Sequence, residues 1–380
     1  MSLSNGLEHR PKLRFKGHDG PWTEKKICDI FQITRGYVLS ANNVFSEPTE
    51  EYKYCVFSSQ TKDNGLMGYY NDYLYENAIT WTTDGANAGT VHFREGKFYC
   101  TNVCGVLFDE YGNANRCTAE ILGNKAKKYV SYVGNPKLMN NVMADIKIFI
   151  PSKEEQYKID AFIKILDEKI AKQQQLVELL KKYKRGMIES TLSKEVTTSY
   201  NLSDIAKIYD GTHQTPIYVT NGIKFVSVEN INNLLQTEKY ISHQSFIKEF
   251  KIRPEKGDVL MTRIGDIGTA SYIDFDDPVA FYVSLALFKC TNLVNGKFLS
   301  YYICSNQFQK ELWKRTLHIA FPKKINTGEI GSCIINLPNI DKQIEISSVL
   351  DKISKKIGFE ETKLNRIIDI KKGLLQQLFI

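Results

Sequence analysis

Two stretches of the chain place apolar residues at every third or fourth position, and each begins just after a proline, Pro151 or Pro338. In the first stretch, positions 163, 166, 170, 173, 177, 180, 184, 187 and 191 hold Ile, Leu, Ile, Gln, Val, Leu, Lys, Met and Thr. In the second, positions 350, 353, 357, 360, 364, 367, 371, 374 and 378 hold Leu, Ile, Ile, Glu, Leu, Ile, Lys, Leu and Leu. Heptads sustained over this length predict a coiled coil. The alternative is an amphipathic helix on a core, which is usually shorter and has a wider apolar stripe.

Polar residues interrupt both seams and indicate how the two helices pair. If the helices run antiparallel with partner numbers summing to 544, Lys184 faces Glu360 and Lys371 faces Gln173. A shift of one heptad would set these polar groups against apolar partners. Because polar seam residues commonly determine register at some cost in stability, we predict this pairing. We also expect an approximate two-fold relation between the two halves of the chain.

The two halves of the sequence resemble each other from end to end. Residues 146–193 match 333–380 at an offset of 187. Upstream, Gly36 matches Gly211 at an offset of 175, and Phe98-Tyr99 matches Phe281-Tyr282 at 183. The segment Thr83–Thr90 matches Thr262–Thr269 at 179, which makes Asp84 equivalent to Arg263. The constant order of these matches predicts duplication of a whole unit.

Outside the heptads, the chain is rich in Tyr, Phe, Gly and Asn. Short runs such as 147–150 and 226–228 are typical of strands, whereas 115–130 and 297–316 are expected to be helical. We therefore predict an α+β protein with two pseudo-symmetric globular α/β domains, separated by two long antiparallel helices that form a coiled coil. The predicted segments are 1–150 (first domain), 151–193 (first spacer helix), 194–337 (second domain) and 338–380 (second spacer helix).

Composition narrows the class of protein. The chain has 380 residues, 42% of them apolar, and a net charge of +7, which permits a nucleic-acid partner without requiring one. Its apolar runs are far shorter than the ~20 residues that span a bilayer, and it begins with no secretory signal pattern. The eight cysteines are too sparse for a disulfide scaffold. We therefore expect reduced thiols and a cytoplasmic protein.

The nearest approach to a metal pattern is His92 with Cys100, Cys104 and Cys117. A structural zinc site usually shows two paired cysteine knuckles, and here one wide C-x3-C stands alone. We interpret these cysteines as small buried residues and predict no metal site.

Sequence patterns of catalysis are missing. The chain has no G-x-x-x-x-G-K-[ST] loop, no H-E-x-x-H, no G-x-S-x-G and no Pro-Pro, which an adenine methyltransferase motif needs. A catalytic constellation would also be expected to recur with the duplication, and none does. We therefore predict a non-catalytic chain with no catalytic residues.

Two similar domains joined by a rigid spacer suit two short sites on one DNA duplex. Arg, Lys, Asn and Gln side chains read base edges or bind phosphates, although most surface lysines are merely solvated. In the first domain the candidate contacts are Arg35, Asn113, Asn115, Arg116, Lys125, Lys127, Lys128, Lys137 and Asn140. In the second they are His213, Gln214, Lys224, Arg263, Lys314, Arg315, Lys323 and Lys324. Lys137 and Lys324 stand out because they occupy equivalent positions of the repeat.

Apolar residues beside the first seam are candidates for packing against a partner helix. They are Phe162, Ile165, Leu176, Leu179, Ile188 and Leu192.

The sequence resembles the specificity subunits of type I restriction–modification systems over essentially its whole length. The opening Pro11-Lys-Leu-Arg-Phe15 through Trp22 is similar to the usual start of that family. The entries into both helices, with Pro151 followed by Gln156 and Pro338 followed by Gln343, are similar as well. The segments 210–216 and 257–265 resemble parts of its target-recognition domains. The first domain lacks the Gly-Thr-His-Gln-Thr-Pro segment, which leaves its contacts less defined.

The resemblance implies a DNA-recognition subunit of a type I restriction–modification complex. Each target-recognition domain would read one half of a bipartite double-stranded DNA site, and the coiled coil would set the gap. Two methyltransferase subunits would dock on the helices, and restriction/translocase subunits would join the complex. AdoMet, ATP and Mg²⁺ would then belong to partner chains, with no cofactor in this one. The alternative is a stand-alone DNA-modifying enzyme, a nuclease or methyltransferase with a divergent site; a coiled-coil adaptor that binds only proteins is a third possibility.

Overall fold

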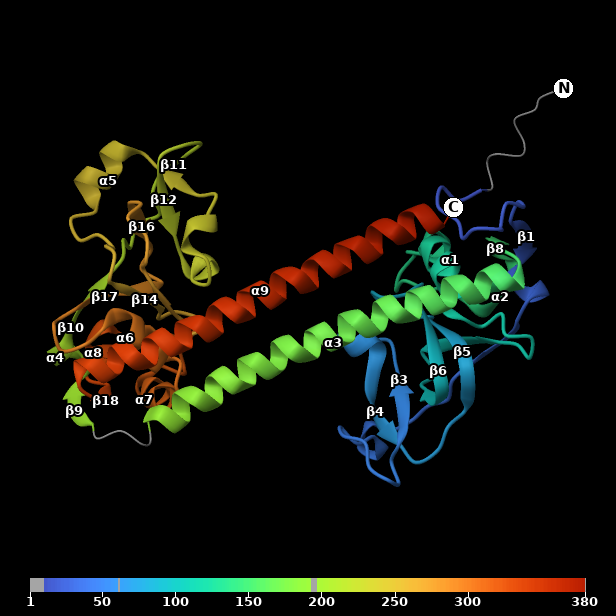
Figure 1. Cartoon of the computed structure of the whole chain (residues 1–380), viewed down its shortest axis with the longest axis horizontal. Coiled ribbons are helices and arrows are strands. Elements are labelled where there is room, and N and C mark those ends of the chain that lie inside the picture. Colours follow the sequence, from blue (N-terminus) through green and yellow to red (C-terminus); the bar gives the residue numbers. More distant parts are fainter. Residues whose placement is uncertain (1–9, 61, 193–196, 380) are drawn as a thin grey trace. The chain divides into compact units, whose positions relative to one another are not determined.

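The computed structural model describes residues 10–60, 62–192 and 197–379. The chain forms two compact units: unit 1 comprises Met1–Gln174 with Lys363–Ile380, and unit 2 comprises Gln175–Thr362 (Figure 1). Each unit therefore includes part of both long helices, so the units cut across the four predicted segments. In the part of the chain that is described, no helix is long and apolar enough to cross a membrane.

Unit 1 is built around a six-stranded sheet with the order β2-β7-β5-β6-β3-β4, and β1 pairs separately with β8. Its strands are β1 (Thr23–Lys26), β2 (Gln32–Arg35), β3 (Tyr54–Phe57), β4 (Leu66–Tyr70), β5 (Tyr75–Thr82), β6 (Val91–Cys100), β7 (Cys104–Phe108) and β8 (Lys147–Ile150). Its short helices are η1 (Ile27–Asp29), η2 (Ala41–Asn43), η3 (Lys62–Gly65), α1 (Arg116–Ala126), η4 (Lys127–Tyr129) and α2 (Asn140–Asp145). Ile79, Trp81 and Leu107 of the sheet share one core with Leu122 of α1 and Ile159 of the long helix that follows.

Unit 2 contains two four-stranded sheets, β10-β17-β14-β15 and β11-β13-β12-β16, and the pair β18-β9. Its strands are β9 (Thr198–Asn201), β10 (Ala206–Asp210), β11 (Tyr218–Val219), β12 (Ile223–Val226), β13 (Tyr240–Ile241), β14 (Val259–Thr262), β15 (Ala270–Tyr272), β16 (Val279–Phe281), β17 (Leu285–Cys290) and β18 (Ile334–Leu337). Its short helices are α4 (Leu202–Ile205), η5 (Val228–Asn230), η6 (Leu234–Gln236), α5 (His243–Glu249), α6 (Gly296–Ile303), α7 (Asn306–Arg315) and α8 (Thr327–Gly331).

Most of the predicted elements are confirmed. Strand β8 covers 147–150, and α1 with η4 covers the helical stretch predicted at 115–130. The stretch predicted at 297–316 is two helices, because Ser305 caps a new helix by accepting a hydrogen bond from Phe308 N. The strand predicted at 226–228 lies earlier in the chain, since β12 ends at Val226 and Val228 begins a 3-10 turn.

The duplication is confirmed by a matching strand arrangement inside each unit. In unit 1, β3 pairs with β6 in parallel, with Phe57 opposite Cys100. In unit 2, β12 pairs with β16 in parallel, with Val226 opposite Phe281. Cys100 is therefore equivalent to Phe281, at an offset of 181. The sequence match of Phe98-Tyr99 to Phe281-Tyr282 was out of step by two residues.

Gly36 and Gly211 occupy the same crowded position in the two units. A Cβ atom on Gly36 would lie 2.1 Å from the carbonyl oxygen of Cys100, and one on Gly211 would lie 2.4 Å from that of Phe281. Any side chain here would collide with the backbone of the neighbouring strand. Glycine is required at both sites for close approach of two backbones, and the predicted equivalence of Gly36 and Gly211 is confirmed.

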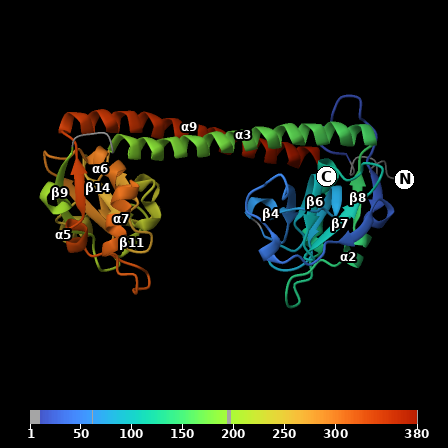
Figure 2. The same ribbon diagram turned by 90° about the horizontal axis from the view of Figure 1, so that it is seen from below.

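The long helices are α3 (Lys153–Leu192) and α9 (Ile340–Leu378), each continuous over the predicted stretch (Figures 1 and 2). All eighteen predicted seam positions are buried or half-buried. Within unit 1, Asp167 of α3 pairs with Lys371 of α9 at 2.6 Å, and within unit 2, Lys181 pairs with Glu361 at 3.0 Å. From the first ion pair to the second, the residue number increases along α3 and decreases along α9. The two helices therefore run antiparallel.

The exact register remains a prediction. The residue numbers of the two ion pairs add up to 538 and 542. Both sums lie between the predicted 544 and the 537 of a register shifted by one heptad. Lys184 lies over the ring of Tyr301 at 4.7 Å, and burial lowers the pKa of its ammonium. Glu360 is buried and pairs with Lys356 at 2.6 Å.

Candidate nucleic-acid interface

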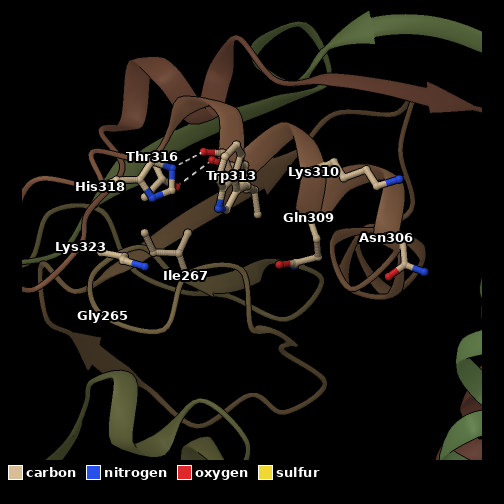
Figure 3. Close-up of a pocket in the computed structure, with 10 residues that line it drawn as sticks. Gly265, Ile267, Asn306, Gln309, Lys310, Trp313, Thr316, His318 and Lys323 are labelled. Carbon is tan, nitrogen blue, oxygen red and sulfur yellow. Dashed lines mark hydrogen bonds between the residues drawn. The ribbon is translucent and has the colours of Figure 1, made fainter.

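A hollow of about 430 Å³ opens on unit 2 between α7, the loop after β14 and the loop after α7 (Figure 3). Helix α7 buries Phe308 and Leu312 in the core and turns its polar side outward. The lining residues are Gly265, Ile267, Asn306, Gln309, Lys310, Leu312, Trp313, Thr316, His318 and Lys323. Amide, cationic and aromatic side chains together are the set that binds phosphates and stacks on bases.

An aromatic pair stands at the edge of this hollow. The rings of Trp313 and His318 are 4.7 Å apart, and His318 Nε2 lies 2.9 Å from the carbonyl oxygen of Trp313 (Figure 3). Trp313 is nevertheless 67% exposed. Tryptophan is a residue type enriched at interfaces with partners.

The loop 317–324, which contains His318, protrudes from unit 2 (Figure 2). Leu317 N donates to the carbonyl oxygen of Lys324 at 2.8 Å, which closes the base of the loop. Gly265 N donates to the carbonyl oxygen of Lys323, also at 2.8 Å. Ile319 and Phe321 at the tip are fully exposed. The loop therefore presents two apolar side chains directly before two exposed lysines.

Arg263 anchors this loop from below instead of facing DNA, which corrects its prediction as a DNA contact. Arg263 is 6% exposed, and its guanidinium donates to the carbonyl oxygens of Val283 and Ile325, each at 2.9 Å. It also lies 3.3 Å from Asp210. His213 approaches the same carboxylate at 3.6 Å but stays exposed.

Unit 1 carries an equivalent loop at 131–137. Ser131 N donates to Lys137 O at 2.8 Å, and Gly85 N donates to Pro136 O at 2.9 Å, as Gly265 does to Lys323 in unit 2. Tyr132 and Val133 are exposed at its tip. Lys137 lies 3.8 Å from Asp84. The predicted equivalence of Lys137 and Lys324 is therefore confirmed.

These hydrogen bonds also correct the alignment of the adjoining loops. Leu138 N donates to Thr83 O just as Ile325 N donates to Arg263 O. Thr83, not Asp84, is therefore equivalent to Arg263, at an offset of 180. The predicted offset of 179 is correct for Gly89 and Gly268, at the end of the loops that follow Thr82 and Thr262. Gly89 N donates to Thr82 O, and Gly268 N donates to Thr262 O. The second loop is shorter by one residue.

Asn115 is a structural residue, which corrects its prediction as a DNA contact. Its side chain is buried, and its Oδ1 accepts a hydrogen bond from Thr118 N to cap α1. Its Nδ2 donates to Gly112 O and to Gln156 Oε1. Asparagine is a favoured N-cap residue. Helix capping, not DNA contact, therefore accounts for the asparagine at this position.

Arg116 is tied into a charge network at the start of α3. It pairs with Glu95 at 2.5 Å and approaches Asp160 at 3.6 Å, while Lys164 also reaches Glu95. Both cations hold the pKa of the Glu95 carboxyl below its usual range. This placement does not favour a DNA contact by Arg116.

The other candidates differ in partners and in exposure, and some that have a partner are exposed. Besides Lys137 and His213, six have local partners: Asn113 with Asp109, Lys125 with Lys147 O, Asn140 with Thr34 O, Lys224 with Leu235 O, and Lys314 and Arg315 with Glu311. Exposed residues are Arg35, Lys127, Lys128, Lys137, His213, Gln214, Lys314, Lys323 and Lys324.

Docking of a partner on α3 stays a prediction, and the residues named for it differ in exposure. Ile165, Leu176 and Leu179 are exposed. Ile188 is wrong as a docking residue because it is buried in the core of unit 2. Phe162 packs on the core of unit 1, with its ring 6.0 Å from that of Phe15. The side chain of Leu192 lies outside the described part.

The cysteines once considered as metal ligands lie in two different cores. Cys100 and Cys104 are buried in the sheet of unit 1, where burial raises the pKa of the Cys104 thiol to about 11. Cys117 is a residue of α1 and is buried in the other core of unit 1. Among the described residues, no group of three His, Cys, Asp or Glu side chains lies close enough to hold a metal ion.

The residues that sequence reasoning missed are the exposed aromatic and apolar ones at the loops. They are Trp313, His318, Ile319, Phe321, Tyr132 and Val133. A signal for the loops was present, because Pro136-Lys137 ends the first loop and Pro322-Lys323 stands one residue before the end of the second.

Comparison with known proteins agrees with this architecture. The family model of the type I restriction modification DNA specificity domain matches twice, at residues 20–182 and 194–368. A protein of Mycoplasma pneumoniae named as a type I specificity subunit is 28% identical over 366 residues, covering 93% of this chain and 94% of that protein.

Two solved structures share the fold. The crystal structure of a type I restriction–modification system S subunit from M. genitalium has a TM-score of 0.66 at 16% identity, covering 97% of this chain and 99% of that one. A chain from a structure on complex assembly and conformational transition of the type I R-M system has a TM-score of 0.54 at 13% identity, covering 96% and 98%. With two matched domains that together span most of its length, the chain belongs to the family of type I restriction–modification DNA specificity subunits.

Proposed function

We propose that this chain recognises a bipartite sequence on double-stranded DNA, with unit 1 reading one half and unit 2 the other. The observation that carries the proposal is the recurrence of one surface in both units with different side chains. Loops 131–137 and 317–324 have the same backbone hydrogen bonds, yet one presents Tyr132 and Val133 and the other Ile319 and Phe321. A duplicated scaffold with divergent tips is what two readers of different sequences require.

The charge of these surfaces supports a DNA partner. Lys310, Lys323 and Lys324 of unit 2 have no carboxylate partner among the residues described. Lys127 and Lys128 are exposed on unit 1 near its loop. Unpaired lysines can neutralise phosphates, and amides such as Asn306 and Gln214 can read base edges.

The spacer between the readers is proposed to set the number of unread base pairs. About 28 paired residues in each helix correspond to about 42 Å at 1.5 Å per residue. This length is a little more than one turn of B-DNA. Lengthening both helices by equal amounts is therefore expected to lengthen the gap without altering the half-sites.

We infer that the chain performs no chemistry of its own and acts inside the cytoplasm as part of a larger complex. Two methyltransferase subunits would dock on the helices, where Ile165, Leu176 and Leu179 are exposed. Restriction/translocase subunits would join through that complex. AdoMet, ATP and Mg²⁺ would be bound by those subunits.

A footprint of the chain with its methyltransferase partner tests this function. Two short protected tracts separated by accessible bases are the expected result. Protection of one continuous tract would contradict two-site reading. The rival enzyme is tested by incubating the chain alone with DNA and Mg²⁺ or AdoMet, where any turnover above that of a mock preparation would favour it.

A further inference from the structure

We propose that loop 317–324 is a wedge that inserts Phe321, supported by Ile319, between two neighbouring base pairs of the DNA. This inference rests on the proposed function, because it specifies how unit 2 contacts the duplex. It adds a distortion of the DNA to the hydrogen-bonded reading described above.

The first argument is the exposure of the tip. Ile319 and Phe321 are fully exposed, although burying such side chains is worth roughly 1.5–3 kcal/mol each. The loop projects from the body of unit 2, so that no neighbouring element covers the tip (Figure 2). Exposed apolar side chains that cluster in this way mark a surface for a partner.

The second argument is that the base of the loop is held firmly. Leu317 N bonds to Lys324 O, and Gly265 N bonds to Lys323 O from the loop after β14. Arg263 donates to Ile325 O immediately after the loop. These contacts fix where the tip emerges, and a wedge needs such preorganisation because ordering costs are then lower on binding.

The third argument is the chemistry around the tip. Lys323 and Lys324 directly follow Phe321-Pro322, and Lys310 and His318 lie in the adjoining hollow (Figure 3). Protein–protein interfaces are depleted of lysine relative to the rest of the surface. A cationic rim around an aromatic tip is instead complementary to stacked bases between two rows of phosphates. Duplex DNA is therefore the partner that this surface fits.

The corresponding loops of the two units differ in their tips and in the surroundings of their last lysine. The equivalent loop carries Tyr132 and Val133, and its Lys137 faces Asp84 at 3.8 Å. The corresponding lysine of unit 2, Lys324, has no such carboxylate among the described residues. We therefore expect stronger unstacking of the DNA by unit 2 than by unit 1.

Apolar wedges in other DNA-binding proteins partly unstack a base step and kink the duplex. Unstacking costs a few kcal/mol per step, which the contacts made by the wedge offset. The cost depends on the step, since pyrimidine–purine steps open most readily. The wedge would thereby contribute specificity at a step without reading hydrogen bonds.

The test uses the chain in complex with its methyltransferase partner and a duplex of the sequence selected from a random pool. 2-Aminopurine replaces one base at a time across the unit 2 half-site. Unstacking raises its fluorescence, and we expect a rise at one step with the unaltered protein. Phe321→Ala is expected to abolish that rise and to weaken binding about tenfold, with Ile319→Ala intermediate.

Ile247→Ala is the matched control, since Ile247 is an exposed isoleucine on α5 of the same unit. It should leave fluorescence and affinity unchanged. The thermal midpoint should be unaffected by all three changes because each side chain is exposed. Specific binding without a fluorescence rise, or a rise that Phe321→Ala retains, would overturn the wedge and leave bipartite reading intact. Loss of methyltransferase binding on Phe321→Ala would overturn it in favour of a protein contact. If the unaltered complex selects no DNA sequence, the proposed function fails first.

Discussion

The side-chain amide of Gln343 donates a hydrogen bond to the carbonyl oxygen of Pro338 at 2.9 Å, where the chain turns from β18 into α9. Gln156 makes the same bond to Pro151 at 3.0 Å at the start of α3. Each glutamine also accepts a bond from its own unit, Gln343 from Asn295 N and Gln156 from Asn115 Nδ2. A buried glutamine therefore fastens each long helix to the domain it enters.

Replacing these glutamines is expected to destabilise the corresponding unit. Gln343→Ala and Gln156→Ala each leave buried partners unsatisfied, which typically costs about 1–3 kcal/mol. Thermal unfolding should show a lower midpoint for each variant. Gln175→Ala, at an exposed position of α3, is the control and should change little. Equal midpoints for all three variants would show that the fastening is unimportant.

Leu350 tests the heptad seam against the neighbouring position. It is 2% exposed in the core of unit 2, whereas Val349 is 37% exposed. Leu350→Ala should cost about 2–5 kcal/mol, because it leaves a cavity in a packed core. Val349→Ala should cost under about 1 kcal/mol. Denaturant unfolding would measure both, and a reversed order would mean that the seam lies on another face of α9.

Lys323 and Lys324 are expected to contact phosphates. Lys323→Ala and Lys324→Ala should each weaken binding to all sequences and reduce the slope of log affinity against log salt by about 0.9. Lys248→Ala, at an exposed lysine of α5, should leave the slope unchanged. Binding titrations between low and moderate salt provide the measurement. An unaltered slope for the two loop variants would place the DNA elsewhere on unit 2.

Arg263 should behave as a structural residue. Arg263→Met removes bonds to Val283 O and Ile325 O and is expected to lower the stability of unit 2 by about 1–3 kcal/mol. The change should show in thermal unfolding without any DNA present. A variant of unaltered stability that has lost selectivity at one base pair would instead restore Arg263 as a base-reading residue.

His92 is expected to make the stability of unit 1 depend on pH. Burial, and secondarily the charge of Arg94, lowers the pKa of His92 from 6.5 to about 4. The unfolded chain therefore binds more protons between these values, so stability is complete above pH 6.5 and is lost as pH falls toward 4. At pH 5 the loss is about 2 kcal/mol. The free energy of unfolding of His92→Gln should depend less steeply on pH over this range. An unchanged slope would mean that other groups cause the pH dependence.

The sequence predicted the features that depend on periodicity and repetition. All eighteen seam positions are buried or half-buried. Residues that recur at helical spacing lie on one face of a regular helix, so their burial follows from the sequence pattern. Gly36 and Gly211 were matched correctly, since close backbone approach admits no other residue.

Other features could not be predicted, for identifiable physical reasons. A loop one residue shorter in unit 2 displaced the match of Asp84 to Arg263, because sequence comparison does not see the hydrogen bonds that align Thr83 with it. Asn115 was taken for a DNA contact because a capping amide and a base-reading amide look alike in sequence. Phe321 was overlooked because a single apolar residue in a loop has no period.

Selection of DNA from a random pool by the chain in complex with its methyltransferase partner tests the central claim most directly. Two units that read independently predict two short conserved tracts separated by a fixed number of unspecified base pairs. Exchanging the unit 2 loops for those of a relative should alter one tract and leave the other and the gap unchanged. A single uninterrupted tract, or no enrichment of any sequence, would contradict the account.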